Sequence, residues 1–142
     1  GHYSDVQRLD LVECELEGTI PTSLGNNLTN LRSLDLSQNT ITGTVPLSIE
    51  NALRLESMNL SAAQLTGSIP AMASERLEVM DLHGNHFGGS VPAMASVALR
   101  ILDLSANVLT GSIPNFHTNV LEVLDLNSNA LAGSIPDSLA SQ

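Results

Sequence analysis

Short runs in which apolar and polar residues alternate recur along the chain, and each run is followed by a turn. In Leu121–Asn129, Leu124 and Leu126 alternate with Asp125. An alternation with a period of two predicts a short β-strand with one buried and one exposed face. We therefore expect a strand here that buries its leucines and exposes Asp125.

This unit occurs six times without a gap, in copies that start near residues 9, 34, 58, 80, 102 and 124. Every copy ends in Gly-x-Ile-Pro or Gly-x-Val-Pro, and its glycine marks the repeat length. These glycines are Gly18, Gly43, Gly67, Gly89, Gly111 and Gly133, so successive units are 25, 24, 22, 22 and 22 residues long. A repeat of this length predicts a solenoid of stacked coils.

One coil contains more than its strand. Asn129 stands at the turn after the strand, where a buried amide can satisfy backbone groups of its own and the adjacent coil. Gly133 permits a positive φ, and residues 134–136 predict a second extended piece with Ile135 facing inward. No coil can bury both faces alone, so coils must stack, with strands about 4.8 Å apart in a parallel sheet.

The pattern L-x-x-L-x-L-x-x-N-x-L, followed by "LTGSIP" at Leu65–Pro70 and Leu109–Pro114, resembles the plant-type leucine-rich repeat. This resemblance implies an α/β-type solenoid: a right-handed superhelix with a parallel β-sheet on the concave face, and a short second sheet and 3₁₀ turns on the convex side. It covers residues 1–142 as a single domain of six repeats. Receptor-kinase ectodomains and polygalacturonase-inhibiting proteins have such repeats, which implies ligand binding through the concave or lateral face.

Some positions depart from the family pattern. The asparagine position of the six repeats is occupied by Cys14, Asn39, Ala63, Asn85, Asn107 and Asn129. Ala63 has no polar group, so we expect the third repeat to be a weak point.

The family's flanking caps of paired cysteines are absent as well, and we expect open strand edges and apolar cross-sections near Val6 and Leu139. A fragment of a longer array, shielding by polar tails and end-to-end stacking of molecules would each explain such ends.

Composition limits the classes of partner. The chain has 142 residues, of which 42% are hydrophobic and 2% aromatic, so the core must be aliphatic. Its formal net charge of −10 disfavours nucleic acid and favours basic partners or cations. No apolar run approaches the roughly 20 residues that cross a bilayer. The family resemblance implies an extracellular or cell-surface location.

The exposed strand positions form columns across the predicted sheet. The central column is Asp10, Asp35, Asn59, Asp81, Asp103 and Asp125. Neighbouring carboxylates at this spacing repel by about 1 kcal/mol even in water. Either the column is a track for a basic peptide, a polyamine or cations, or the aspartates are routine residues hydrogen-bonded to serines such as Ser37 and Ser105.

Beside the central column, Val79, Ile101 and Val123 form an apolar strip on a face that we expect to be exposed to solvent. A strip of this kind suits an amphipathic partner with basic and apolar side chains, although valine and isoleucine are also ordinary strand residues. On the other side of the column, His83 and His86 form an H-x-x-H spacing without an evident third ligand. We predict no metal site and no cofactor.

Catalysis finds no support in the sequence. No serine, histidine and acid set stands out from the repeat background, and no nucleophile elbow or phosphate-binding glycine loop is present. The hydroxyl column Thr19, Thr44, Ser68, Ser90, Ser112 and Ser134 leaves ice binding as a minor alternative. Two N-x-[ST] sequons make Asn27 and Asn59 candidate glycosylation sites.

The sequence thus predicts a non-catalytic recognition module that binds a protein, peptide or glycan through the concave face. The main alternative is a structural solenoid that forms end-to-end filaments or a surface layer. The candidate ligand-binding residues are Asp35, Asn59, Asp81, Asp103, Asp125, Val79, Ile101, Val123 and His83.

Overall fold

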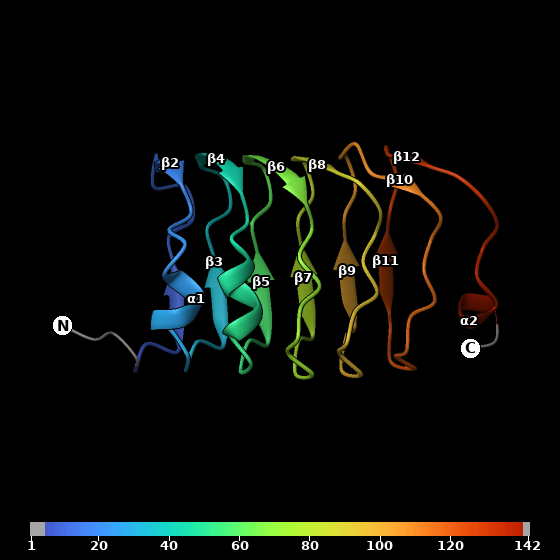
Figure 1. Ribbon diagram of the computed structural model, residues 1–142, viewed down its shortest axis with the longest axis horizontal. Coiled ribbons are helices and arrows are strands. Elements are labelled where there is room, and N and C mark those ends of the chain that lie inside the picture. The colour runs from blue at the N-terminus through green and yellow to red at the C-terminus, as the bar shows by residue number, and fades with distance from the viewer. Residues whose placement is uncertain (1–4, 141–142) are drawn as a thin grey trace.

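Six short strands lie side by side in the computed structural model, which describes residues 5–140 (Figure 1). They form one parallel sheet in chain order, with one strand from each repeat: β1 (Arg8–Asp10), β3 (Ser33–Asp35), β5 (Ser57–Asn59), β7 (Val79–Asp81), β9 (Ile101–Asp103) and β11 (Val123–Asp125). The register places equivalent residues of successive repeats opposite one another, as with Asp81 and Asp103. The predicted solenoid of stacked coils is confirmed.

A second set of short parallel strands runs along the upper edge of the stack in Figure 1. Four of them pair in one sheet, β2 (Glu17–Thr19), β4 (Thr40–Thr44), β6 (Gln64–Ser68) and β8 (His86–Gly88), and two in another, β10 (Thr110–Gly111) and β12 (Ala130–Leu131). The register pairs Thr19 with Thr42 and Thr44 with Thr66. The hydroxyls of the column proposed for ice binding are therefore not directly opposite one another.

Helices occur where the coils are long. The one-turn helix α1 (Leu24–Asn27) and the 3₁₀ helix η1 (Leu47–Asn51) lie side by side in front of the strands in Figure 1, and α2 (Asp137–Ala140) lies at the other end. Gly25 makes the first contact possible, because a Cβ there would lie 1.9 Å from the carbonyl oxygen of Ser48. The expected 3₁₀ turn is present as η1. Between residues 69 and 122, the coils of 22 residues contain no helix.

In these short coils, a buried side-chain hydroxyl binds the backbone groups that a helical turn would otherwise satisfy. Ser96 Oγ donates to the carbonyl oxygens of Glu75 at 3.1 Å and Leu77 at 2.7 Å, and accepts the N–H of Ala98 at 3.1 Å. Ser74 and Thr118 make the same three contacts in their own coils. One side chain thus satisfies backbone groups of two neighbouring coils where the chain runs irregularly.

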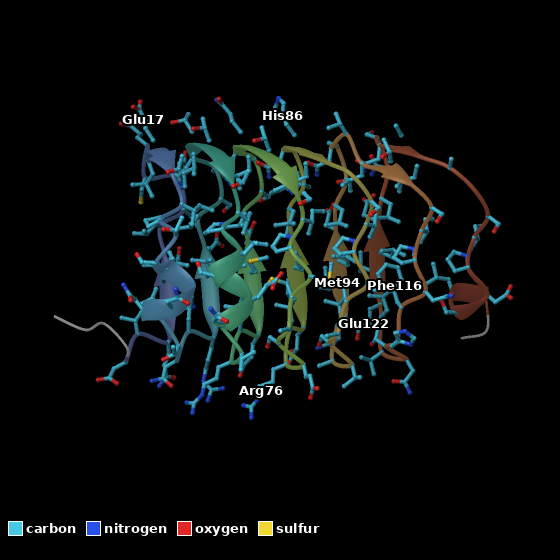
Figure 2. All side chains as sticks on the ribbon, viewed as in Figure 1. Glu17, Arg76, His86, Met94, Phe116 and Glu122 are labelled. Carbon is cyan, nitrogen blue, oxygen red and sulfur yellow. The ribbon has the colours of Figure 1, made fainter. Side chains whose placement is uncertain are left out.

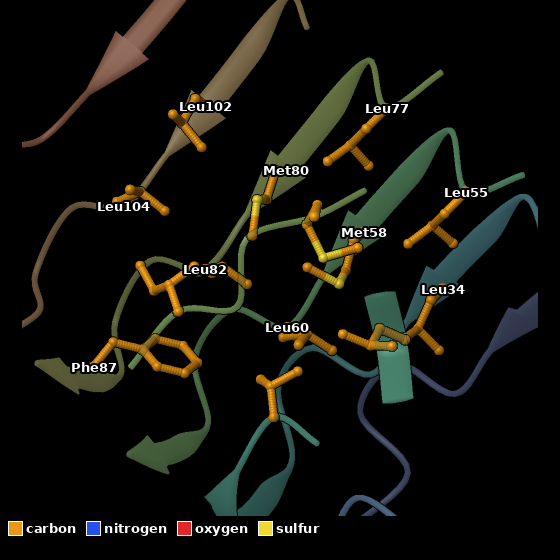
Figure 3. Packing of buried hydrophobic residues seen from close by; sticks show 14 of the residues in the cluster. Leu34, Leu55, Met58, Leu60, Leu77, Met80, Leu82, Phe87, Leu102 and Leu104 are labelled. Carbon is orange, nitrogen blue, oxygen red and sulfur yellow. The ribbon is translucent and has the colours of Figure 1, made fainter. Parts of the chain in front are cut away.

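The hydrophobic core fills the space between the six-stranded sheet and these turns. Figure 3 shows Leu34, Met58, Met80 and Leu102 from four successive strands, each at most 1% exposed. Leucine is the commonest buried hydrophobic side chain, with methionines, Phe87 and Phe116 beside it, in agreement with the predicted aliphatic core. Ile135 was predicted to face inward and is instead 73% exposed, because no further coil within residues 5–140 covers that side of the last repeat.

The asparagines form a ladder along the turns that follow the strands. Asn107 Nδ2 donates to the carbonyl oxygens of Leu82, Leu104 and Ser105 at 3.1 Å, and its Oδ1 accepts the N–H of Phe87 at 2.9 Å. Asn39, Asn85 and Asn129 make equivalent bonds, each to its own coil and to the preceding one. Ala63 stands at the asparagine position of its coil but has no side-chain acceptor. The N–H of Ile41, which corresponds to that of Phe87, therefore has no asparagine Oδ1 to bind.

The two end coils are packed less completely than the central ones. Leu9, Leu11 and Leu16 at one end are only partly buried, as are Leu124 and Leu126 at the other. This agrees with the expectation of apolar cross-sections at both ends of the stack.

The asparagine ladder gives a first prediction. Replacing Asn107 with alanine removes the acceptor of the buried Phe87 N–H and one of the donors to each of three carbonyl oxygens, and should lower the free energy of unfolding by about 2 kcal/mol. Ala63→Asn should raise it by about 1 kcal/mol, since asparagine fits the equivalent place in four other coils. Urea unfolding followed by circular dichroism measures both changes, and an Asn107→Ala variant of unchanged stability would contradict this role.

The hydroxyls of the short coils give a second prediction. Ser96 is 2% exposed, so Ser96→Ala should lower the free energy of unfolding by about 2 kcal/mol through the unsatisfied carbonyls it leaves. The matched control is Ser112→Ala, at an exposed position, where a change within about 0.5 kcal/mol is expected. Equal effects of the two substitutions in the same unfolding assay would refute the proposed role of Ser96.

Candidate functional site on the outer face of the six-stranded sheet

The candidate site lies on the outer face of the six-stranded sheet, which is the face opposite the core. The strands have the predicted alternation, so the middle residue of each points inward and its two neighbours point outward. Val79 and Ile101 are half-buried there, and Val123 is 46% exposed. The structure brings the apolar strip and the central column side by side, because each strand ends on an aspartate or asparagine two residues after the strip.

The central column has a structural task that the sequence reasoning only partly anticipated. Asp103 Oδ1 accepts the backbone N–H of Ser105 at 2.9 Å and the hydroxyl of Ser105 at 2.6 Å. Asp35 and Asn59 bind Ser37 and Ser61 in the same way. The serine partners were predicted, but the closing of each strand by a backbone N–H was missed. One carboxylate oxygen of each aspartate therefore already accepts hydrogen bonds from the turn that follows its strand.

Negative charge is unevenly distributed along the column. At one end, Arg8 forms an ion pair with Asp10 at 2.7 Å, and this hydrogen bond holds the pKa of Asp10 below its ordinary value. In the third coil Asn59 is neutral, and its Nδ2 donates to Asp35 Oδ2 at 3.3 Å. Among the described residues, no arginine and no amide of a neighbouring coil bonds to Asp81, Asp103 or Asp125 of the last three strands, and we call these three the uncompensated carboxylates. Asp81 has the imidazole of His83 beside it instead.

His83 joins this acidic half of the column. It occupies the place that Ser61 and Ser105 have in neighbouring coils, and its Nδ1 lies 2.9 Å from Asp81 Oδ1. His86 is exposed on β8, and Figure 2 shows it at the upper edge of the stack, among the side chains of the second sheet. The H-x-x-H spacing therefore does not form a two-histidine site, and His83 is grouped with aspartates instead.

A row of charged residues lines the edge of the outer face where the strands begin. Arg32 pairs with Glu56, and Arg100 pairs with Glu122 at 2.7 Å. The hydrogen bond that Arg100 donates to the carboxylate of Glu122 raises the pKa of Arg100 above its ordinary value. Exposed pairs of this kind contribute little stability, but the charges within each pair cancel. With Glu78 as a further acid on this edge, the central column carries most of the negative charge of the face.

The two candidate glycosylation sites differ in accessibility. Asn27 is exposed at the end of α1, at the opposite side of the coil from the strand. Asn59 is half-buried on the outer face, and both ends of its amide are hydrogen-bonded. The structure therefore presents Asn27 more openly than Asn59.

Comparison with known families shows what these repeats are. The family model described as "Leucine Rich Repeat" matches residues 5–27, 30–52, 76–96, 98–119 and 120–142. The chain belongs to the leucine-rich repeat family. The longest unmatched stretch, residues 53–75, includes Ala63, where the asparagine ladder is interrupted.

Solved structures of plant receptor ectodomains resemble this leucine-rich repeat chain. The ectodomain of the Arabidopsis thaliana receptor kinase GASSHO1/SCHENGEN3, in complex with CASPARIAN STRIP INTEGRITY FACTOR 2, is 33% identical with a TM-score of 0.83, over 89% of this chain and 16% of that one. The SOBIR1 ectodomain from Arabidopsis thaliana is 30% identical with a TM-score of 0.80, over 87% and 71%.

A third similar structure is that of the BIR3–SERK2 complex from Arabidopsis thaliana, which is 34% identical with a TM-score of 0.74, over 88% of this chain and 69% of that one. No curated protein matches the chain significantly. Within residues 5–140, no helix of this leucine-rich repeat structure is long and apolar enough to span a membrane.

The capping role of the aspartates gives a third prediction. Asp103→Ala should lower the free energy of unfolding by about 1 to 2 kcal/mol, because the N–H and hydroxyl of Ser105 lose their acceptor. Asp103→Asn should remain within about 0.5 kcal/mol of the parent, because Asn59 caps its own coil in the same manner. Thermal or urea unfolding tests this, and an asparagine variant as unstable as the alanine variant would show that the charge, rather than the acceptor, matters.

Proposed function

We propose that this chain is a non-catalytic recognition module that binds a peptide or protein segment on the outer face of the six-stranded sheet. The observation that carries the proposal is the apolar strip of Val79, Ile101 and Val123 beside the uncompensated carboxylates of Asp81, Asp103 and Asp125. Backbone capping accounts for one oxygen of each carboxylate. It does not account for an apolar strip that stays in contact with water.

The chemistry of this face specifies the partner. A segment with alternating basic and apolar side chains would place its cations over the aspartates and its apolar groups over the strip. Burial of the strip would supply affinity, and the acidic column would supply orientation and a fast, salt-dependent association. Scarcity of aromatic residues implies modest affinity for any single contact, since tryptophan and tyrosine anchor most tight interfaces.

The similar ectodomains support this class of function. The GASSHO1/SCHENGEN3 ectodomain is in complex with CASPARIAN STRIP INTEGRITY FACTOR 2, and BIR3 is in complex with SERK2. Because the GASSHO1/SCHENGEN3 and SOBIR1 structures are receptor-kinase ectodomains, we propose an extracellular or cell-surface location for this chain, with Asn27 as its candidate glycan site. The specific partner and the use of the outer face are part of the proposal.

A peptide panel tests the proposal. Fluorescently labelled peptides with alternating lysine and leucine, and matched peptides with glutamate and leucine, are titrated against the chain in the presence of EDTA. The basic peptide should bind, and Asp81→Asn, Asp103→Asn and Asp125→Asn combined should weaken its binding about tenfold or more. Ile101→Asn should also weaken it, through loss of the apolar contact.

The matched control removes the same charge elsewhere. Glu13, Glu15 and Glu17 are exposed beyond the first strand, so their triple glutamine variant lowers the net negative charge by the same amount. It should leave binding unchanged. Equal weakening by the two triple variants, or no effect of Ile101→Asn, would mean that the peptide responds to overall charge and not to this face.

A further inference from the structure

The geometry points to a binding site for a divalent transition-metal ion, of the Zn²⁺ or Co²⁺ class, formed by Asp81, His83 and Asp103 on the outer face. One carboxylate oxygen from each aspartate and one ring nitrogen of His83 lie within 4.8 Å of one another. The three residues come from adjacent coils: β7 with the turn that follows it, and β9. The inference is independent of the proposed function.

The distances suit one ion. Zn²⁺ bonds to nitrogen and oxygen at about 2.0 to 2.2 Å, so two ligand atoms of a tetrahedral site lie about 3.3 to 3.6 Å apart. The donor atoms therefore have to approach one another by up to about 1.5 Å, which rotation about the side-chain torsions of Asp81, His83 and Asp103 can supply. All three residues are half-buried, which limits competing conformations and leaves the outward side of the site open to solvent.

Asp81 and Asp103 each have one carboxylate oxygen that the hydrogen bonds of the fold do not use. In the part of the chain that the structure describes, the hydrogen bonds to Asp81 and Asp103 all end on Oδ1. Their Oδ2 atoms are therefore available without breaking either cap. A metal ion could use these oxygens while the two strands stay closed.

The first half of the central column, from Asp10 to Asn59, differs from the half that contains Asp81 and Asp103. This difference supports a cation between Asp81 and Asp103. Between Asp35 and Asn59 an amide donor bridges the two coils, and at Asp10 an arginine neutralises the charge. Among residues 5–140, no such donor joins Asp81 to Asp103, although the register places them directly opposite one another. The basic side chain at this place is the imidazole of His83, which stands where the neighbouring coils have serine.

The donor set indicates which ions would bind. One imidazole and two carboxylates suit Zn²⁺, Co²⁺ and similar first-row ions, whereas Ca²⁺ requires six to eight oxygen ligands. Three protein ligands leave at least one coordination position open for water or for a group of a bound partner.

Cobalt binding tests the site directly. Co²⁺ added to the intact chain should give visible d–d absorption that saturates at one ion per chain and disappears when Zn²⁺ is added. His83→Ser should abolish the absorption. The substitution is mild, because Ser61 and Ser105 make the same hydrogen bond in adjacent coils, and melting in EDTA verifies that the variant is folded.

Two comparisons complete the experiment. His86→Ser removes an exposed histidine outside the cluster and should leave Co²⁺ binding unchanged, whereas Asp103→Asn should weaken it at least tenfold. Zn²⁺ should raise the melting temperature of the parent and not that of His83→Ser. Absence of Co²⁺ absorption at millimolar ion, retention of binding by His83→Ser, or an equal melting shift with Mg²⁺ would overturn the assignment.

Discussion

The structure depends on the satisfaction of backbone hydrogen bonds at the turn that follows each strand of the six-stranded sheet. At this turn the chain leaves one sheet and heads for the second, and the backbone groups that face the core are shielded from water, as the burial of Asn39, Asn85 and Asn107 shows. A buried N–H or C=O without a partner costs free energy comparable to a lost hydrogen bond, so the turn needs a side chain with both donors and an acceptor. Asparagine provides this, and its amide reaches the preceding coil as well as its own. The same bonds that close a coil therefore join it to its neighbour.

The same requirement explains the two lengths of coil. A coil of 24 or 25 residues has enough chain for a helical turn, which satisfies its own backbone groups. A coil of 22 residues lacks it and uses a buried hydroxyl, as Ser96 shows. The two solutions are compatible within one stack because each leaves the six-stranded sheet in the same register. Variation on this side therefore does not disturb the outer face.

Much of the fold could be predicted from the sequence because the repeat is nearly exact. The strands, the buried leucines, the asparagine ladder and the positive φ of Gly133 follow from the period and from the residue types. Ile135 was predicted incorrectly because the repeat pattern does not say whether a coil has a neighbour on both sides. The hydroxyl contacts of Ser74, Ser96 and Thr118 were missed, although each stands three residues before the leucine that precedes the next strand. In the sequence these residues look like ordinary surface serines and threonines.

The candidate site was predicted less completely than the fold. The columns of the outer face follow directly from strand alternation, and so does the neighbourhood of Asp81 and Asp103. The position of His83 depends on the conformation of the turn, so its contact with Asp81 and its separation from His86 could not be read from an H-x-x-H spacing. The unequal distribution of charge was also hidden, because it depends on Arg8 turning toward Asp10 and on the amide of Asn59 turning toward Asp35.

Amide hydrogen exchange measured by NMR tests the central role of the asparagine ladder most directly. The N–H groups of Leu65, Phe87 and Leu109 each donate to an asparagine Oδ1, whereas for the equivalent N–H of Ile41 the asparagine position is occupied by Ala63, which has no side-chain acceptor. We predict that the first three exchange slowly and together, and that Ile41 exchanges clearly faster and slows to their rate in the Ala63→Asn variant. An Ile41 amide as protected as the other three in the parent chain would contradict the account.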